Sequence, residues 1–339
     1  MTENDQLEQI QAEDVAAIDA LRKDYDRMRN ELGRVIVGQQ SVIERLAICL
    51  FAQGHALLIG VPGLAKTMLV KRLAETMDLG FSRIQFTPDL MPMDITGTEI
   101  LHEGNGGRRE FEFVKGPVFA NIVLADEINR APSKTQAAML EAMQEHRVTA
   151  AGHAHDLEQP FFVLATQNPI EQEGTYPLPE AQLDRFMFMI DVGYPTLEEE
   201  IEIGRLTTGD PMPTLNHMMD GPKVQAYQEL VRRLPVPDHI YKFAAHLVRR
   251  TRPSDSEAPE WLKPLVTWGA GPRAMQYLIL GAKSRAALQG SYMVRQEDVV
   301  AVAEPVLMHR VLTSFGAESE GVDSRQVVHR ITEELEKEG

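Results

Sequence analysis

The chain has little cysteine, few aromatic residues and no long apolar run. Its 339 residues include a single cysteine, Cys49, so an intramolecular disulfide is excluded and a reducing compartment is indicated. No apolar run reaches the roughly 18 to 20 residues that a bilayer-spanning helix needs. The N-terminus also lacks the basic start and apolar core of a signal peptide. We therefore expect a cytoplasmic protein without a membrane span, in which Cys49 is a buried core residue.

The chain also lacks positive charge. It carries 50 acidic and 34 basic side chains, for a formal net charge of -16. Such a balance repels phosphate backbones unless a local basic stripe compensates for it. The arginine pairs, such as Arg108-Arg109 and Arg232-Arg233, are short. We therefore do not expect nucleic acid to be the partner.

The composition that is present favours two globular domains. Hydrophobic residues make up 43% of the chain, which is enough for a sizeable core. Residues 1–195 contain the apolar strand patterns, together with an N-terminal helical pattern over residues 7–32. At Tyr194-Pro195-Thr196 an acidic run begins a helix, and apolar residues then recur at helical spacing. We predict an α/β domain over 1–195 and a smaller all-helical domain over 196–339.

The most informative motif is a strand that runs into a glycine-rich turn and then a Lys-Thr pair. In such a turn, consecutive backbone N–H groups and the start of the next helix form a cradle for phosphate. Lys66 would reach the β- and γ-phosphates and Thr67 would hold Mg²⁺. Ala65 stands where a glycine is usual, and we expect it to have entered helical φ. The predicted nucleotide-binding residues are Gly60, Val61, Pro62, Gly63, Leu64, Ala65, Lys66, Thr67 and Met68.

Two further strands end in polar residues that complement this loop. The apolar residues 122–125 lead into Asp126, which would help to hold Mg²⁺, and Glu127, which would deprotonate the attacking water. Residues 161–166 lead into Asn168, whose amide could contact the γ-phosphate or the water. Taken separately, the acidic pair could be a solvated strand end and Asn168 part of an Asn-Pro turn. Their joint occurrence after the phosphate loop predicts an ATPase site.

Other patterns surround this predicted site. An apolar turn that includes Val37 and Gly38 precedes the loop and either lines an adenine pocket or simply starts a helix. Alternation over 97–102 and 108–114 predicts a hairpin with Phe111 and Phe113 on a buried face, turning at the glycine-rich segment 104–107. A second hairpin is predicted over 146–157. Its histidines suit a polar rim better than a metal site, because they lack helical spacing and cysteine neighbours.

Together these motifs resemble those of AAA+ ATPases of the MoxR family. The resemblance covers residues 35–195 closely and the C-terminal helices more weakly. It rests on the sequence strings at 60–67, 126–131, 165–169 and 174–186, and Ala65 is usual in this family. The implied fold is α/β, with an AAA+ P-loop core made of a parallel sheet, flanking helices and inserted hairpins, and a smaller helical lid.

The resemblance also implies roles for three further residues. Asn168 is similar to the residue called sensor 1, Arg185 to the arginine finger offered to a neighbouring subunit, and Arg273 to sensor 2 reaching back from the lid. Arg130 is another candidate for an intersubunit arginine. From residue type alone, Arg185 could instead form an ordinary salt bridge with Asp184 or Glu180 on a helix face. Arg273 could equally be a solvated arginine at a helix start.

The function implied by the resemblance is Mg²⁺-dependent ATP hydrolysis in a ring, typically a hexamer of identical chains. Members of the family act as chaperone-like ATPases with von Willebrand factor A (VWA) domain partners, often in maturing an enzyme complex. The alternative on the same scaffold is a nucleic-acid motor or loader, against which the acidic balance argues.

Overall fold

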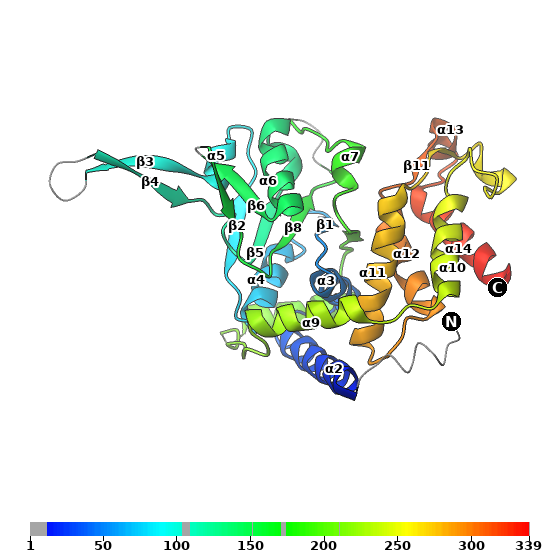
Figure 1. Cartoon of the computed structure of the whole chain (residues 1–339), viewed down its shortest axis with the longest axis horizontal. Coiled ribbons are helices and arrows are strands. Elements are labelled where there is room, and N and C mark those ends of the chain that lie inside the picture. Colours follow the sequence, from blue (N-terminus) through cyan, green and yellow to red (C-terminus); the bar gives the residue numbers. More distant parts are fainter. Residues whose placement is uncertain (1–11, 104–108, 151, 171–173, 210, 339) are drawn as a thin grey trace.

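The computed structural model describes residues 12–103, 109–150, 152–170, 174–209 and 211–338 (Figure 1). A parallel sheet with its helices lies at the centre, a two-stranded hairpin projects from one side, and the C-terminal helices gather on the other. Among the described residues, no helix is both long and apolar enough to cross a bilayer.

The central sheet has five parallel strands in the order β2-β5-β8-β1-β9. The strands are β1 (Ala56–Ile59), β2 (Phe81–Gln85), β5 (Ile122–Asp126), β8 (Phe162–Gln167) and β9 (Phe188–Asp191). The predicted parallel sheet is therefore confirmed. Because all five strands run the same way, the turns that follow β1, β5 and β8 meet at one edge, where ligands of open α/β sheets bind.

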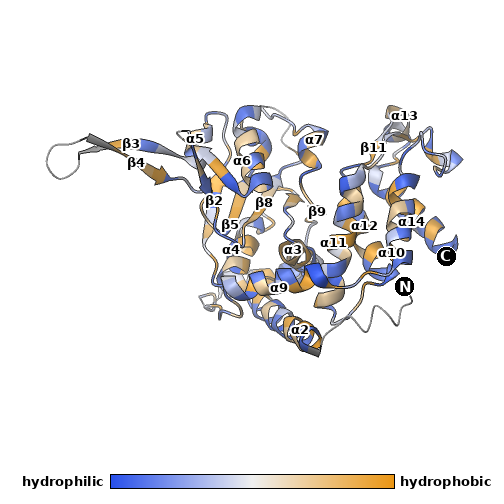
Figure 2. Ribbon diagram, viewed as in Figure 1, coloured by the Kyte–Doolittle hydropathy of each residue, from blue (hydrophilic) through white to orange (hydrophobic). Residues whose placement is uncertain are grey.

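Side chains on the two faces of this sheet enter two separate hydrophobic clusters. In β5, Ile122 and Leu124 face one cluster, and Val123 and Ala125 face the other. The first cluster includes residues of α2 (Ala12–Leu32), α3 (Gln40–Phe51) and α4 (Lys66–Thr76), and the second includes residues of α6 (Ser133–Glu145). Hydrophobic residues accordingly dominate the strands in Figure 2. Covering both faces explains the unbroken apolar runs in the three inner strands β1, β5 and β8, whereas the edge strand β2 carries Ser82 and Arg83.

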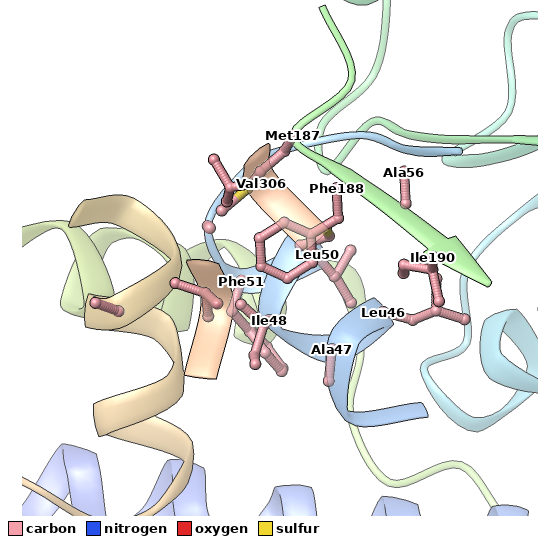
Figure 3. Packing of buried hydrophobic residues seen from close by; sticks show 14 of the residues in the cluster. Leu46, Ala47, Ile48, Leu50, Phe51, Ala56, Met187, Phe188, Ile190 and Val306 are labelled. Atoms are coloured by element: carbon pink, nitrogen blue, oxygen red, sulfur yellow. The ribbon is translucent and has the colours of Figure 1, made fainter. Parts of the chain in front are cut away.

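The α3–β9 contact illustrates this packing (Figure 3). Leu46, Leu50 and Phe51 of α3 lie against Phe188 and Ile190 of β9, and all five side chains are buried. Cys49 is buried in the same helix, as expected, and desolvation raises the pKa of its thiol well above the usual value. This helix thus anchors the edge strand to the core.

Both predicted hairpins are present. They consist of β3 (Gly97–Glu103) with β4 (Arg109–Lys115), and β6 (Arg147–Ala150) with β7 (His153–Asp156). The glycine turn at 104–107 lies outside the described residues. The expected burial of Phe111 is wrong: this side chain is 72% exposed, because the hairpin projects beyond the core next to α5 (Pro92–Thr96). Phe113 is partly covered, by a stacked His155 ring at 3.9 Å between centroids.

The C-terminal part is helical apart from one short ribbon. Its strands β10 (Val266–Trp268) and β11 (Leu312–Thr313) pair antiparallel, so the prediction of an all-helical segment is wrong at this point. These strands are three and two residues long, too short for an alternating pattern to be recognised. The helices are α8 (Leu197–Thr208), α9 (Gly221–Arg233), α10 (Asp238–Arg250), α11 (Pro272–Leu288), α12 (Gln296–Leu307), α13 (Phe315–Ser319) and α14 (Ser324–Glu338). Short helical turns at α7 (Glu180–Leu183), η1 (Ile128–Arg130) and η2 (Glu260–Leu262) complete the fold.

Candidate functional site

The glycine-rich loop joins β1 directly to α4. At Gly60 an added Cβ would lie 2.8 Å from the carbonyl oxygen of Val192, so only glycine lets the loop leave the sheet here. Gly63 has a φ of 88°. Ala65, the residue before α4, has a φ of 54° and is left-handed, so the expectation that it has entered helical φ is wrong. A non-glycine residue in this region is disfavoured on its own, and the surrounding loop holds it there.

A cavity of about 430 Å³ lies against this loop. It collects residues from the ends of β1, β5 and β8, as the sheet topology requires. It is lined by Pro62, Gly63, Leu64, Ala65, Lys66, Thr67, Met68, Arg83, Asp126, Glu127, Thr166 and Asn168. Predicted phosphate, metal and water-activating residues that are up to 106 positions apart in the sequence, from Pro62 to Asn168, are thus brought to one place.

Lys66 turns back onto the loop that carries it. Its Nζ donates to the carbonyl oxygens of Gly60 and Val61, the latter at 3.1 Å. Gly60 and Val61 therefore bind the Lys66 side chain through their carbonyl oxygens and do not line the cavity themselves. Desolvation lowers the pKa of Lys66, whereas the nearby carboxylates of Asp126 and Glu127 raise it. Lys66 therefore places a positive charge on the wall of the cavity, next to the glycine-rich loop.

Asp126 is buried at the end of β5 and has two partners. The hydroxyl of Thr166 donates to its Oδ1 at 2.6 Å. The guanidinium of Arg83, on β2, donates to Oδ2 from Nε at 2.9 Å and from Nη2 at 2.6 Å. Sequence reasoning missed Arg83, since only the pairing of β2 with β5 brings it to this carboxylate. The Arg83 guanidinium balances the charge of the Asp126 carboxylate, so a metal ion that binds this carboxylate would have to displace it.

Glu127 points into the same cavity and is held from two sides. Gln85 Nε2 donates to its Oε2 at 2.8 Å, and Arg130 Nη1 donates to the same oxygen at 2.9 Å. Arg130 is thus placed beside the predicted base of its own chain.

Asn168, at the end of β8, is buried, and its Oδ1 accepts from the backbone N–H of Ile170 at 3.2 Å. The side-chain nitrogen of Asn168 remains as the donor on this part of the cavity wall.

A second, apolar cavity of about 260 Å³ adjoins the first. The two share Gly63, Leu64, Ala65 and Met68 of the loop. Val37 lines the second cavity as predicted, whereas Gly38 does not, because the carboxylate of Glu199 lies directly against it. The remaining lining residues are Val35, Ile36, Gln39, Pro195, Ile203, Leu206 and Thr207. Those contributed by α8 were not foreseen from the sequence.

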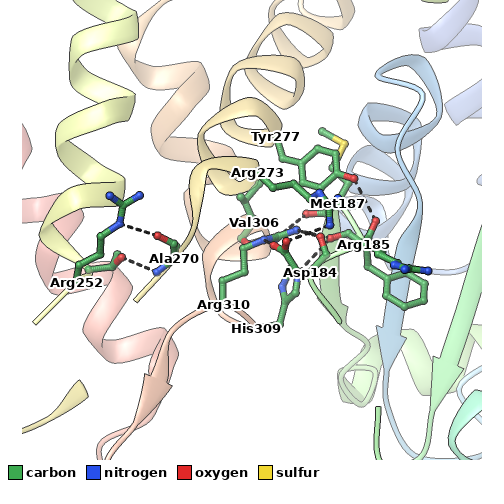
Figure 4. Close-up of polar contacts among 12 residues, drawn as sticks. Asp184, Arg185, Met187, Arg252, Ala270, Arg273, Tyr277, Val306, His309 and Arg310 are labelled. Atoms are coloured by element: carbon green, nitrogen blue, oxygen red, sulfur yellow. Dashed lines mark hydrogen bonds and ion pairs between the residues drawn. The ribbon is translucent and has the colours of Figure 1, made fainter. Parts of the chain in front are cut away.

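Arg185 and Arg273 lie elsewhere. Both line a separate cavity of about 180 Å³, together with Tyr277, and neither lines the cavity of Lys66. Asp184 does not pair with Arg185: its carboxylate accepts from Arg273 Nη1 at 3.1 Å and from Arg310 Nε at 2.7 Å (Figure 4). The structure thus brings Arg273 next to Arg185 and not next to the phosphate loop of the same chain.

This fold and this site define an ATPase of the AAA class. Residues 55–188 match the model of the ATPase family associated with various cellular activities, and residues 260–331 match the AAA lid domain. Within the class, the chain belongs to the MoxR family.

Two relatives and one solved structure document this membership. The chain is 43% identical to chaperone MoxR1 of Mycobacterium tuberculosis over 89% of this chain and 79% of that one. It is 30% identical to protein MoxR of Methylorubrum extorquens, over 84% and 86%. A crystal structure of a protein assigned as an ATPase from Cytophaga hutchinsonii has a TM-score of 0.87 at 42% identity, covering 93% of this chain and 95% of that one. The resemblance and the fold class predicted from the sequence are therefore confirmed.

Proposed function

We propose that the chain hydrolyses ATP with Mg²⁺ across the two adjoining cavities. The observation that carries this proposal is that Lys66, Thr67, Asp126 and Glu127 line one polar cavity, which shares four residues of the loop with an adjoining apolar one. The base of a nucleotide suits the apolar cavity, and its phosphates suit the cationic loop.

The donor set of the polar cavity fits Mg²⁺. The Thr67 hydroxyl and the Asp126 carboxylate are the oxygen ligands that this ion prefers, and both lie beside Lys66. Bound there, the ion would neutralise charge on the phosphates. Glu127 would take a proton from the attacking water, and Asn168 would orient the γ-phosphate or that water. Arg83 and Arg130 would have to release their carboxylates as the metal and the nucleotide enter.

Arg185 is proposed to act on the nucleotide of a neighbouring subunit in a homo-oligomeric ring, by resemblance a hexamer. Its absence from the wall of its own phosphate cavity supports this role. Arg273, proposed as sensor 2, faces the same cavity as Arg185, so its action on the neighbouring nucleotide has to be tested beside action on its own. We propose a domain boundary near residue 195, before α8.

The use of ATP is proposed to be chaperone-like remodelling or maturation of a protein complex, with a VWA-domain protein as partner. The curated name of the Mycobacterium tuberculosis relative, a chaperone, supports this class of work. A nucleic-acid motor on the same scaffold is the alternative, and the net charge of -16 disfavours it.

Calorimetric titration with ATP tests the proposed nucleotide site. Lys66→Ala removes the cation that would face several phosphate oxygens, so we expect ATP binding to be lost. Lys71→Ala is the matched control, because Lys71 is an exposed lysine on the same helix and lines neither nucleotide cavity. An unchanged ATP affinity of the Lys66→Ala protein would reject the assignment.

A further inference from the structure

The segment that carries Arg185 links α7 to β9, and its backbone N–H groups are satisfied within the core. Those of Asp184, Arg185 and Phe186 donate to carbonyls of residues 180, 182 and 183, and that of Met187 donates to His55. Through its backbone N–H groups, the segment is therefore bound to the core.

The carbonyl groups of the same segment accept hydrogen bonds from the C-terminal part of the chain, and the described residues offer them no donor from the core. The Tyr277 hydroxyl donates to the Arg185 carbonyl at 3.1 Å. Arg310 donates to the carbonyls of Asp184 at 2.8 Å, Phe186 at 2.7 Å and Met187 at 3.3 Å. Four consecutive carbonyls are thus bound by side chains from residues 260–331, the part that matches the AAA lid domain.

Two further contacts strengthen this hold on the segment. His309 Nε2 lies 3.1 Å from the Phe186 carbonyl, and since burial keeps the pKa of His309 well below its usual value, the neutral ring donates from this nitrogen. The Asp184 carboxylate accepts from Arg273 and Arg310. The Arg310 side chain is only 2% exposed. A buried arginine with five acceptor atoms around it fixes a backbone firmly.

The Arg185 side chain, in contrast, is not held. Within the part of the chain that the structure describes, its guanidinium makes no hydrogen bond or ion pair, and in Figure 4 it points away from the Arg310 cluster. A fixed backbone with a side chain available for an outside partner is the arrangement that an arginine acting on another subunit needs.

We propose that Tyr277, His309 and Arg310 are positioning residues for Arg185, so that the lid of each subunit sets where its arginine meets the nucleotide of the next. This inference rests on the proposed function, in which Arg185 acts in trans. The lid of one subunit thereby influences hydrolysis in its neighbour.

Mixed rings of two variants provide the test. Arg185→Ala subunits keep an intact nucleotide site but lack the arginine, whereas Lys66→Ala subunits keep the arginine but lack the site. ATPase activity in rings confirmed as mixed, by capture on two different tags, then reports Arg185 acting across the interface. Tyr277→Phe is added either to the Lys66→Ala donor or to the Arg185→Ala acceptor. It removes one oxygen and retains the ring that lies 5.1 Å from the Arg310 guanidinium.

We expect Tyr277→Phe in the donor to lower the activity of mixed rings about three- to tenfold, the scale of one hydrogen bond, and in the acceptor to leave it unchanged. Tyr292→Phe is the matched control in both arms, because this lid hydroxyl donates to Asp19 of α2 and not to the 184–187 segment. Equal losses in both arms, or no loss in the donor, would overturn the positioning role while leaving Arg185 in trans. If the parent mixture recovers no activity, the proposed trans role itself fails, and this inference with it.

Discussion

At the scale of single residues, Glu127 is the side chain on which turnover depends in the proposed mechanism. We expect Glu127→Gln to bind ATP as tightly as the wild type while turnover falls by about 10²-fold or more, because an amide cannot take the proton from water. Calorimetry and phosphate release measure the two quantities. Glu141→Gln, on the exposed face of α6, is the control. Turnover close to that of the wild type would place the base elsewhere.

At the scale of elements, His55 joins the start of β1 to α6 and β8. Its Nδ1 accepts from the Val163 N–H at 3.0 Å, so its Nε2 donates to the Met143 carbonyl, also at 3.0 Å. Desolvation lowers the pKa of this ring to about 4. A protonated ring would direct a second N–H at the Val163 N–H, so the fold requires the neutral form.

This requirement predicts how stability depends on pH. The unfolded chain protonates His55 near pH 6.5 and the folded chain only near pH 4. The contribution of His55 to the unfolding free energy is therefore fully present well above pH 6.5 and is lost as the pH falls from 6.5 towards 4. We expect His55 to account for a loss of about 2 kcal/mol of unfolding free energy between pH 7 and pH 5. Denaturant unfolding of His55→Gln, which can replace both hydrogen bonds, should lack this component.

His153→Gln serves as the control for that comparison, because the His153 side chain is exposed on β7. The same pH dependence in the wild type and in His55→Gln would show that the buried ring does not couple folding to protonation.

The junction between the core and the lid depends on Arg310. We expect Arg310→Met to destabilise the fold by about 3 to 5 kcal/mol, since it removes the guanidinium that binds the Asp184 carboxylate and the carbonyls of Asp184, Phe186, Met187 and Val306. Among the described residues, only Arg273, on the Asp184 carboxylate, and His309, on the Phe186 carbonyl, would remain as donors to these groups. Urea unfolding measures this change. Arg205→Met, at an exposed position in the last turn of α8, should change stability by less than about 0.5 kcal/mol. A loss below about 1 kcal/mol for Arg310→Met would mean that water replaces the guanidinium.

At the scale of the whole molecule, the net charge of -16 bears on the class of partner. We expect the ATPase rate to be indifferent to single-stranded DNA and RNA even at low salt, where counterion release favours electrostatic binding most. Rates measured with and without each polymer, over a range of salt concentrations, test this. Strong stimulation that fades with added salt would favour the nucleic-acid motor.

The sequence allowed much of the phosphate and metal site to be predicted, because its parts are local. A strand, a turn and a Lys-Thr pair lie within a dozen residues, and Asp126 and Glu127 directly follow an apolar strand. Parallel strands then necessarily bring Lys66, Asp126 and Asn168 to one edge. Arg83 could not be foreseen, because its contact depends on the sheet order, which the sequence pattern leaves open.

Conformation and exposure were predicted less well. Ala65 is left-handed, because the loop as a whole imposes a backbone angle that a single residue would avoid. Phe111 alternates with charged residues as a buried strand residue would, yet it is exposed, since no other element covers the end of the hairpin. Both outcomes depend on what surrounds the residue in space.

By itself, the sequence determined the family, the parallel α/β core and the residues of the phosphate loop, because each is written in short motifs and in the period of apolar residues. Only the tertiary structure decided that Arg273 lies beside Arg185 and that Arg310 binds the backbone from Asp184 to Met187. These residues lie 88 to 126 positions apart in the sequence. Folding alone brings such distant residues together, since no local pattern specifies which lid side chain meets which core carbonyl.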